Sequence, residues 1–146
     1  MPGPSSFTPR PINRSIPRKH FTAHQANQTL PLVQRIVGDI VAMHENALNL
    51  QEKLESSRDT KFAPAAQSKL DAAMDRLKDL VDELSGIGCE LKDYQTGLID
   101  FVGRHQGRDV YLCWKLGEEK VAYWHELNAG FAGRKPISML QEGEKV

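Results

Sequence analysis

LVQRIVGDIVAMHENALNLQEKLE, residues 32–55, carries apolar side chains at intervals that alternate between four and three residues. On an α-helix this spacing gathers the apolar side chains into one stripe and leaves polar side chains on the other faces. The stripe consists of Ile36, Ile40, Met43, Ala47, Leu50 and Leu54. The stretch therefore predicts a long amphipathic helix with one continuous apolar seam.

A second seam with the same alternating spacing follows after the polar and turn-forming segment SSRDTKFAPAAQSK, residues 56–69. Its members are Ala66, Leu70, Ala73, Leu77, Leu80, Leu84 and Ile87. Two seams of matching length joined by a short connection favour an antiparallel helical hairpin, which we expect over residues 22–86. We interpret both seams as the coiled-coil-like core of this hairpin.

The first helix has a clear start signal. Thr22 followed three residues later by Gln25 is the capping-box pattern, so we expect the helix to begin here. Pro31 lies nine residues further along, and we expect it to kink or restart the helix because proline cannot donate a backbone hydrogen bond.

The pattern changes from helical to extended after Gly86 and Gly88, either of which could cap the second helix. Short segments rich in β-branched and aromatic residues then alternate with turn sequences, which predicts an antiparallel meander over residues 89–128. We expect three strands, with residues 89–93 as a candidate fourth, and a C-terminal loop over 129–140. The fold class is therefore α+β, with a single domain at residues 20–140.

Neither face of the strands expected at 109–116 and 120–127 is plainly polar, so this sheet needs a cover on both faces. The helical hairpin can provide one cover. The other could be the C-terminal segment, a folded-back N-terminal tail, a bound ligand or a second copy of the chain. We favour a homodimer or the folded-back tail.

Residues 1–19 contain five of the eight prolines and four basic residues but no acid, which is typical of a disordered tail. The whole chain has 19 acids and 19 bases, so residues 20–146 hold 15 bases against 19 acids. That balance makes nucleic-acid binding an unfavoured function. We expect a soluble cytoplasmic protein, because there is neither a secretory signal nor an apolar run of roughly 18 residues for a membrane span.

The triplet Trp124, His125 and Glu126 lies in an expected strand, where neighbouring side chains point to opposite faces. His125 must therefore find its partners on other strands, and the candidates are Asp100, Tyr111 and Cys113. A histidine with a carboxylate and a thiol or phenol could act as a general base or hold a metal ion. Alternatively, His125 is a core residue satisfied by one hydrogen bond.

Further polar residues accompany this group. Arg134 follows two glycines in GFAGR and could close over an anionic ligand. Glu90 and Asp93 lie in the first strand segment, and Trp114 adjoins Cys113. These charges form either a ligand pocket or an ion-pair network that fixes the turns. Both cysteines can equally be small buried thiols, because no CxxC pair is present.

The words ELKD (90–93), GLIDF (97–101), YLCW (111–114), WHE (124–126) and GFAGR (130–134) follow the predicted hairpin in this order. In this, residues 19–138 resemble the bacterial domain family DUF2203. The resemblance implies the same architecture and a bacterial origin, and it implies no particular reaction. The positions that would carry any shared site are Glu90, Asp93, Asp100, Tyr111, Cys113, Trp114, His125, Glu126 and Arg134.

Two classes of function remain open from the sequence. The one we favour is a structural or protein-interaction module that docks a partner through the hairpin or the sheet. The other is a small-ligand or metal-binding domain, with or without catalysis, whose site surrounds Asp100, His125 and Glu126. The sequence contains none of the GxxxxGK[ST], GxGxxG, GxSxG or HExxH motifs, and it indicates no particular cofactor.

Overall fold

The computed structural model describes residues 19–143, so the tail expected over residues 1–19 lies outside the described residues except for Lys19. Two helices are followed by the strands of one sheet and two short 3₁₀ helices. Their bounds are α1 Ala23–Ser56, α2 Ala63–Ile87, β1 Cys89–Asp93, β2 Leu98–His105, β3 Arg108–Lys115, β4 Tyr123–His125, η2 Phe131–Gly133, β5 Lys135–Pro136 and η3 Ile137–Met139. Within residues 19–143, no helix has both the length and the apolar character that crossing a membrane requires.

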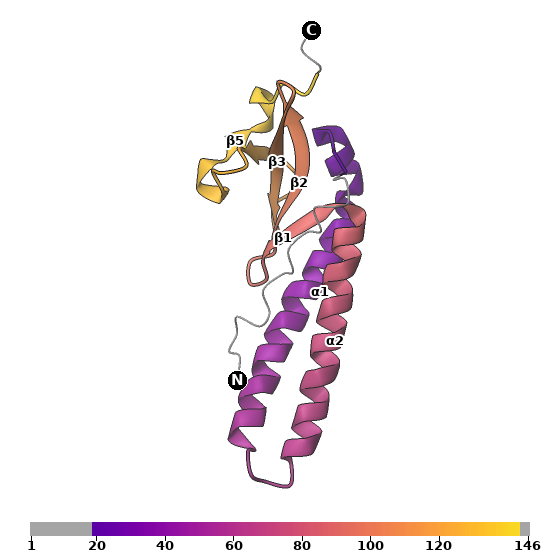
Figure 1. Ribbon diagram of the computed structural model, residues 1–146, viewed down its shortest axis with the longest axis vertical. Helices are drawn as coiled ribbons and strands as arrows, with labels where there is room; N and C mark the ends of the chain where they lie inside the picture. Colours follow the sequence, from indigo (N-terminus) through magenta and orange to yellow (C-terminus); the bar gives the residue numbers. More distant parts are fainter. Residues whose placement is uncertain (1–18, 144–146) are drawn as a thin grey trace.

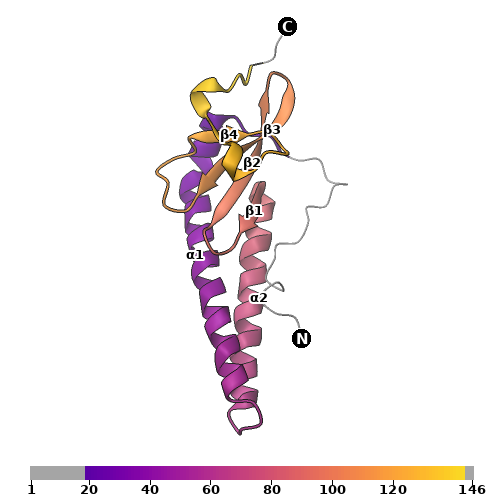
Figure 2. The ribbon, with the colours of Figure 1, turned by 90° about the vertical axis from the view of Figure 1, so that its left-hand side faces the viewer.

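The helices form the antiparallel hairpin that the two seams predict, and the sheet packs against one end of it (Figure 1). The sheet lies beside the start of α1 and the end of α2, while the connection between the helices lies at the far end (Figure 2). The hairpin therefore extends well beyond the sheet. The α+β fold class is confirmed.

The sheet has five antiparallel strands in the order β1-β2-β3-β4-β5, one or two more than expected. The additional strand is β5, which lies within the segment expected to be a loop. It pairs with β4, and the indole of Trp124 donates a hydrogen bond to the carbonyl of Pro136 at 3.1 Å. Proline can occupy this edge position because an outer strand has no need of its missing N–H.

The strand expected at 120–127 is shorter than expected, because β4 comprises only Tyr123–His125. The backbone of Val121 is satisfied by a side chain of α1 instead of by a strand. Val121 N–H donates to Asn27 Oδ1 at 2.8 Å, and Asn27 Nδ2 donates to the Val121 carbonyl at 3.1 Å. A helix side chain thus replaces the strand pairing at this point.

The hydrophobic core lies between the hairpin and one face of the sheet. Both seams contribute to it, although Leu50, Leu54 and Ala66, near the far end of the hairpin, are only partly buried. The large side chains fully enclosed in it include Ile40, Leu80, Leu84, Phe101, Leu112, Trp114 and Trp124. The apolar seams therefore pack inside the protein itself.

The start of α1 has the expected capping box, in which Thr22 and Gln25 exchange backbone and side-chain hydrogen bonds of 3.0 Å. Pro31 does not restart the helix, which continues through it from Ala23 to Ser56. One backbone hydrogen bond is lost there. The buried side chains of Leu30 and Val33 on either side hold this turn against the core.

Phe21 connects the start of α1, the end of α2 and the sheet. Its N–H donates to the Val102 carbonyl at 2.8 Å, and its ring meets Phe101 edge-on with centroids 4.9 Å apart. Gly88 caps α2 in the left-handed conformation with φ 117°. A Cβ at Gly88 would lie 2.9 Å from Cε1 of Phe21, so both the backbone angle and the space require glycine.

We predict that Gly88→Ala lowers the free energy of unfolding by about 1–3 kcal/mol, because alanine is strained at positive φ and would displace Phe21. Gly86→Ala is the matched control, since Gly86 lies in the helix with nothing within 4 Å of its Cβ position. The control should be neutral or stabilise by up to about 1 kcal/mol. Urea unfolding of both variants checks this, and equal stability of the two would contradict it.

The segment after η3 is held against the turn that connects β2 and β3. Gln106 N–H donates to the Gln141 carbonyl at 2.8 Å, and Gln141 N–H donates to Nδ1 of His105 at 3.0 Å. Glu142 accepts a hydrogen bond from the backbone of Ala23 at the start of α1. The His105 ring also stacks on Trp124 with centroids 4.4 Å apart. His105 must keep Nδ1 unprotonated to accept its hydrogen bond.

Burial, together with the positive charges of Arg108 and Lys135, lowers the pKa of His105 despite the opposing charge of Glu126. As the pH falls below about 6.5, His105 therefore binds a proton in the unfolded chain before it does so in the folded one. The stability that neutral His105 contributes at higher pH is lost in acid. We predict that His105→Phe, which keeps the stacking, destabilises the protein more at about pH 7.5 than at about pH 5. Denaturant unfolding at both values tests this. An equal cost at the two pH values would contradict it.

Candidate functional site

The second face of the sheet, opposite the core, carries a group of polar side chains. In the register of the strands, Asp100 of β2 pairs with Cys113 of β3, and Tyr111 of β3 pairs with His125 of β4. Since side chains alternate along a strand, these four residues share one face while Trp124 joins the core on the other. Neighbouring strands thus supply an acid, a thiol, a phenol and an imidazole to one surface.

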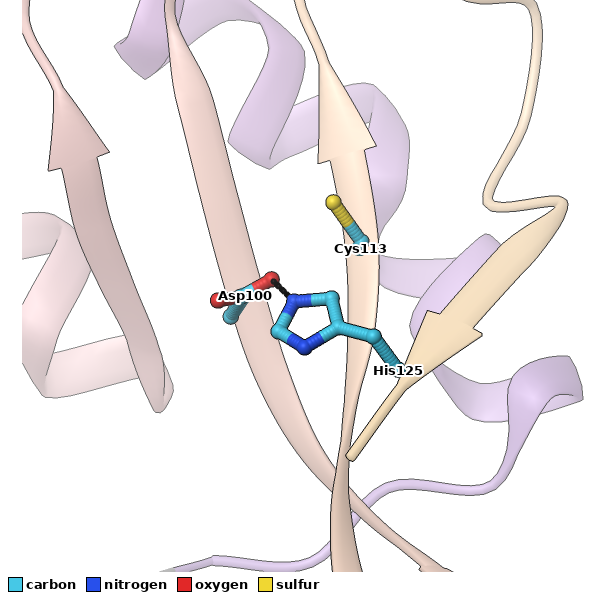
Figure 3. Close-up of side chains that lie close together, drawn as sticks. All are labelled: Asp100, Cys113 and His125. Carbon is cyan, nitrogen blue, oxygen red and sulfur yellow. Dashed lines mark hydrogen bonds and ion pairs between the residues drawn. The ribbon is translucent and has the colours of Figure 1, made fainter. Parts of the chain in front are cut away.

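Three of these side chains form a compact cluster of potential metal ligands. One ligand atom each from Asp100, Cys113 and His125 lies within 4.8 Å of the others, and the three come from β2, β3 and β4 (Figure 3). Asp100 and His125 are each 3% exposed and Cys113 is fully enclosed. The cluster is therefore shielded from bulk water.

His125 makes a hydrogen bond through each ring nitrogen. Nδ1 lies 2.8 Å from the carbonyl oxygen of Glu126, and Nε2 lies 3.2 Å from Oδ1 of Asp100. A carbonyl oxygen can only accept, so Nδ1 carries a proton. Nε2 is then the nitrogen that exchanges its proton or binds a metal ion.

The electrostatic balance at His125 favours its charged form. Burial alone lowers the pKa of His125, but the hydrogen bonds to Asp100 and the Glu126 carbonyl, with the charge of Asp100, raise it above its ordinary value. The contacts with Asp100 and Glu126 therefore favour a proton on the His125 imidazole, and the pair lies largely out of water. Such a pair is costly to bury and costly to break by removing one partner.

Cys113 is held as a neutral thiol. Burial, followed by the negative charge of Asp100, raises the pKa of Cys113 to about 12. A nucleophilic cysteine needs an accessible thiolate and a base directed at it, and here both nitrogens of His125 are engaged elsewhere. The arrangement does not resemble a cysteine–histidine catalytic pair. A bound metal ion, in contrast, would deprotonate the thiol directly.

The structure does not bring Glu126 into the cluster. Its carboxylate faces Arg108, whose Nε lies 3.1 Å from Oε1, and water reaches this ion pair. Glu126 follows directly after the end of β4, and the ion pair with Arg108 holds its side chain there. Only the backbone carbonyl of Glu126 takes part.

Tyr111 and Glu90 lie beside the cluster. The Tyr111 hydroxyl is 3.3 Å from both carboxylate oxygens of Glu90, and Lys92 lies 2.9 Å from Glu90 Oε1 and over the Tyr111 ring. The Tyr111 and His125 rings are in contact, with centroids 5.5 Å apart. Lys92 was not a candidate from the sequence, although its position two residues after Glu90 puts both on one face of β1.

The remaining candidates have other surroundings. Asp93 accepts hydrogen bonds from Thr96 in the β1–β2 turn, and Trp114 lies in the core with its indole donating to the Glu118 carbonyl at 3.0 Å. Arg134 lies 2.7 Å from Oε1 of Glu118. Glu118 is one of the acids in the charged segment that the sequence interprets as either a ligand pocket or an ion-pair network.

The family model described as "Uncharacterized conserved protein (DUF2203)" matches residues 19–137. The chain belongs to the DUF2203 family. The matched range covers both helices and the sheet through β5, including every residue of the cluster. No curated protein and no solved structure matches the chain. The chemistry of this DUF2203 protein must therefore be argued from its own side chains.

We predict that Asp100→Ala lowers the free energy of unfolding by about 3 kcal/mol, because it removes the carboxylate from a buried pair and leaves His125 Nε2 without its partner. Glu126→Ala is the matched control and should change stability little, since water screens its ion pair with Arg108. Thermal and denaturant unfolding provide the comparison. Similar stability of the two variants would contradict this, because the buried Asp100–His125 pair would then contribute no more than the exposed Arg108–Glu126 pair.

Proposed function

We propose that this DUF2203 protein binds a divalent transition metal ion of the zinc class through Asp100, Cys113 and His125. The observation that carries the proposal is the placement of three different ligand atoms within 4.8 Å of one another by three adjacent strands. All three side chains are buried, so their positions are set by the sheet.

The combination of donors indicates the class of metal. A thiolate, an imidazole and a carboxylate together suit Zn²⁺ and chemically similar ions such as Co²⁺, whereas Mg²⁺ and Ca²⁺ take oxygen ligands. The negative charges of one thiolate and one carboxylate would balance a divalent cation. This balance matters in a site shielded from water.

The hydrogen bond from His125 Nδ1–H to the Glu126 carbonyl supports the same conclusion. Metal-binding histidines characteristically donate their other ring N–H to a carbonyl or carboxylate, which fixes the tautomer and aims the free nitrogen. Here that nitrogen is Nε2, on the side of Asp100. A metal ion would replace the proton that Asp100 and His125 now share.

The spacing requires only a small adjustment. In a tetrahedral zinc site with Zn–S of about 2.3 Å and Zn–N of about 2.0 Å, neighbouring donors lie about 3.5 Å apart. Nε2 of His125 and Oδ1 of Asp100 are already 3.2 Å apart, and the widest separation in the cluster is within 4.8 Å. Side-chain rotations that move the donor atoms by about 1 Å would therefore bring them into place.

Docking of a partner protein, or of a second copy, stays a prediction. The apolar seams pack against each other inside the hairpin, so they do not offer a surface to a partner. The second face of the sheet carries this polar cluster, so it is not a continuous apolar surface for a partner. These observations favour the metal site over the interaction module.

We predict one equivalent of zinc per chain after purification in its presence and gel filtration, measured by plasma mass spectrometry. Cys113→Ser and His125→Ala should each reduce the bound metal at least about tenfold, because each removes a ligand. Cys89→Ser is the matched control, since Cys89 is equally enclosed but lies on the core face of β1.

Retention of a full equivalent of zinc by both site variants would refute the site. So would equal loss in Cys89→Ser, because the effect would then follow from any buried cysteine. Circular dichroism of each variant establishes that metal loss is measured on folded protein.

A further inference from the structure

Arg134 is fixed beside the cluster on its β4 side. Its guanidinium donates to Oε1 of Glu118 at 2.7 Å and lies between two aromatic rings, 4.1 Å from the Tyr123 centroid and 4.5 Å from the Phe131 centroid. The side chain is 12% exposed. The ion pair and the two rings hold this guanidinium in one place, and its role as a clamp on an anion stays a prediction.

One nitrogen of this guanidinium is buried without a hydrogen-bond partner in the described part of the chain. Nε of Arg134 is buried and has no hydrogen-bond acceptor among residues 19–143. A buried N–H without an acceptor costs about 1–3 kcal/mol, and more when it belongs to a charged group. Native proteins keep such groups rarely and often at functional sites.

The unused donor belongs to the surroundings of Cys113. Tyr123, on which the guanidinium stacks, is the direct cross-strand partner of Cys113. Because paired residues of adjacent strands present their side chains on the same face, Arg134 lies on the face that carries the metal-ligand cluster.

We propose that the site takes a small oxyanion, such as a carboxylate or bicarbonate, with one oxygen on the metal ion and another accepting a hydrogen bond from Nε of Arg134. This inference rests on the proposed metal site. Three protein donors leave the fourth position of a tetrahedral ion open to an exchangeable ligand. An anion with two oxygens can fill that position and satisfy the arginine at once.

The charges of the site agree with an anionic ligand. Thiolate and carboxylate neutralise the divalent ion, and Glu118 neutralises Arg134 through a contact with Nη2 only. Among residues 19–143, no group accepts a hydrogen bond from the Nε–H. A neutral ligand such as water would satisfy it less strongly than an oxyanion, because hydrogen bonds between charged groups are the stronger ones.

The test uses the full chain loaded with Co²⁺, whose visible absorption reports both thiolate ligation and changes at the fourth position. Sodium acetate and sodium bicarbonate are titrated separately into the wild type, Arg134→Lys and Arg108→Lys. Lysine keeps the positive charge but has no Nε–H in the guanidinium geometry. Arg108→Lys is the matched control, because Arg108 pairs with Glu126 away from the cluster.

We expect at least one anion to change the cobalt spectrum of the wild type. Its apparent Kd should rise about tenfold or more in Arg134→Lys and stay within about twofold in Arg108→Lys. A cobalt–thiolate band that neither anion alters, or equal affinities in all three proteins, would overturn the oxyanion site alone. Absence of the cobalt–thiolate band from the wild type would overturn the metal site, and the oxyanion proposal with it.

Discussion

The pairing of β2, β3 and β4 is the constraint on which the rest of the structure depends. Once Phe101, Leu112 and Trp124 are committed to the core, alternation sends their neighbours to the opposite face. Those neighbours include Asp100, Cys113 and His125. Packing of the hairpin against one face therefore determines the chemistry available on the other. A shift of one residue in either pairing would split the cluster between the two faces of the sheet.

The second face carries groups that a purely structural sheet would avoid. Burying an imidazolium and a carboxylate costs free energy that apolar residues of similar size would not cost. Burial and the charge of Asp100 keep the Cys113 thiol protonated beside them, and Nε of Arg134 has no acceptor among residues 19–143. These unfavourable features meet at one place on the sheet. In the proposed site, a divalent cation would balance the carboxylate and a thiolate, and an anionic fourth ligand would supply the acceptor that Nε of Arg134 lacks.

Much of the fold could be predicted from the sequence, because its signals are local. The alternating seam spacing determines the hairpin, and Thr22 with Gln25 marks its first residue. Strand alternation was enough to separate His125 from Glu126. What could not be predicted depends on contacts between distant segments. The side chain of Asn27 binds the backbone of Val121, 94 residues away, in place of a neighbouring strand, and β4 is shorter as a result. Which of Asp100, Tyr111 and Cys113 meets His125 depends on the register of three strands, and no local pattern encodes that register.

X-ray absorption at the zinc edge of the reconstituted protein tests the central claim most directly, because it reads the ligand atoms themselves. We predict one sulfur at about 2.3 Å and nitrogen or oxygen ligands at about 2.0–2.2 Å, with the sulfur contribution lost in Cys113→Ser and kept in Cys89→Ser. A shell of oxygen and nitrogen alone in the wild-type protein, or a sulfur contribution that survives Cys113→Ser, would contradict it.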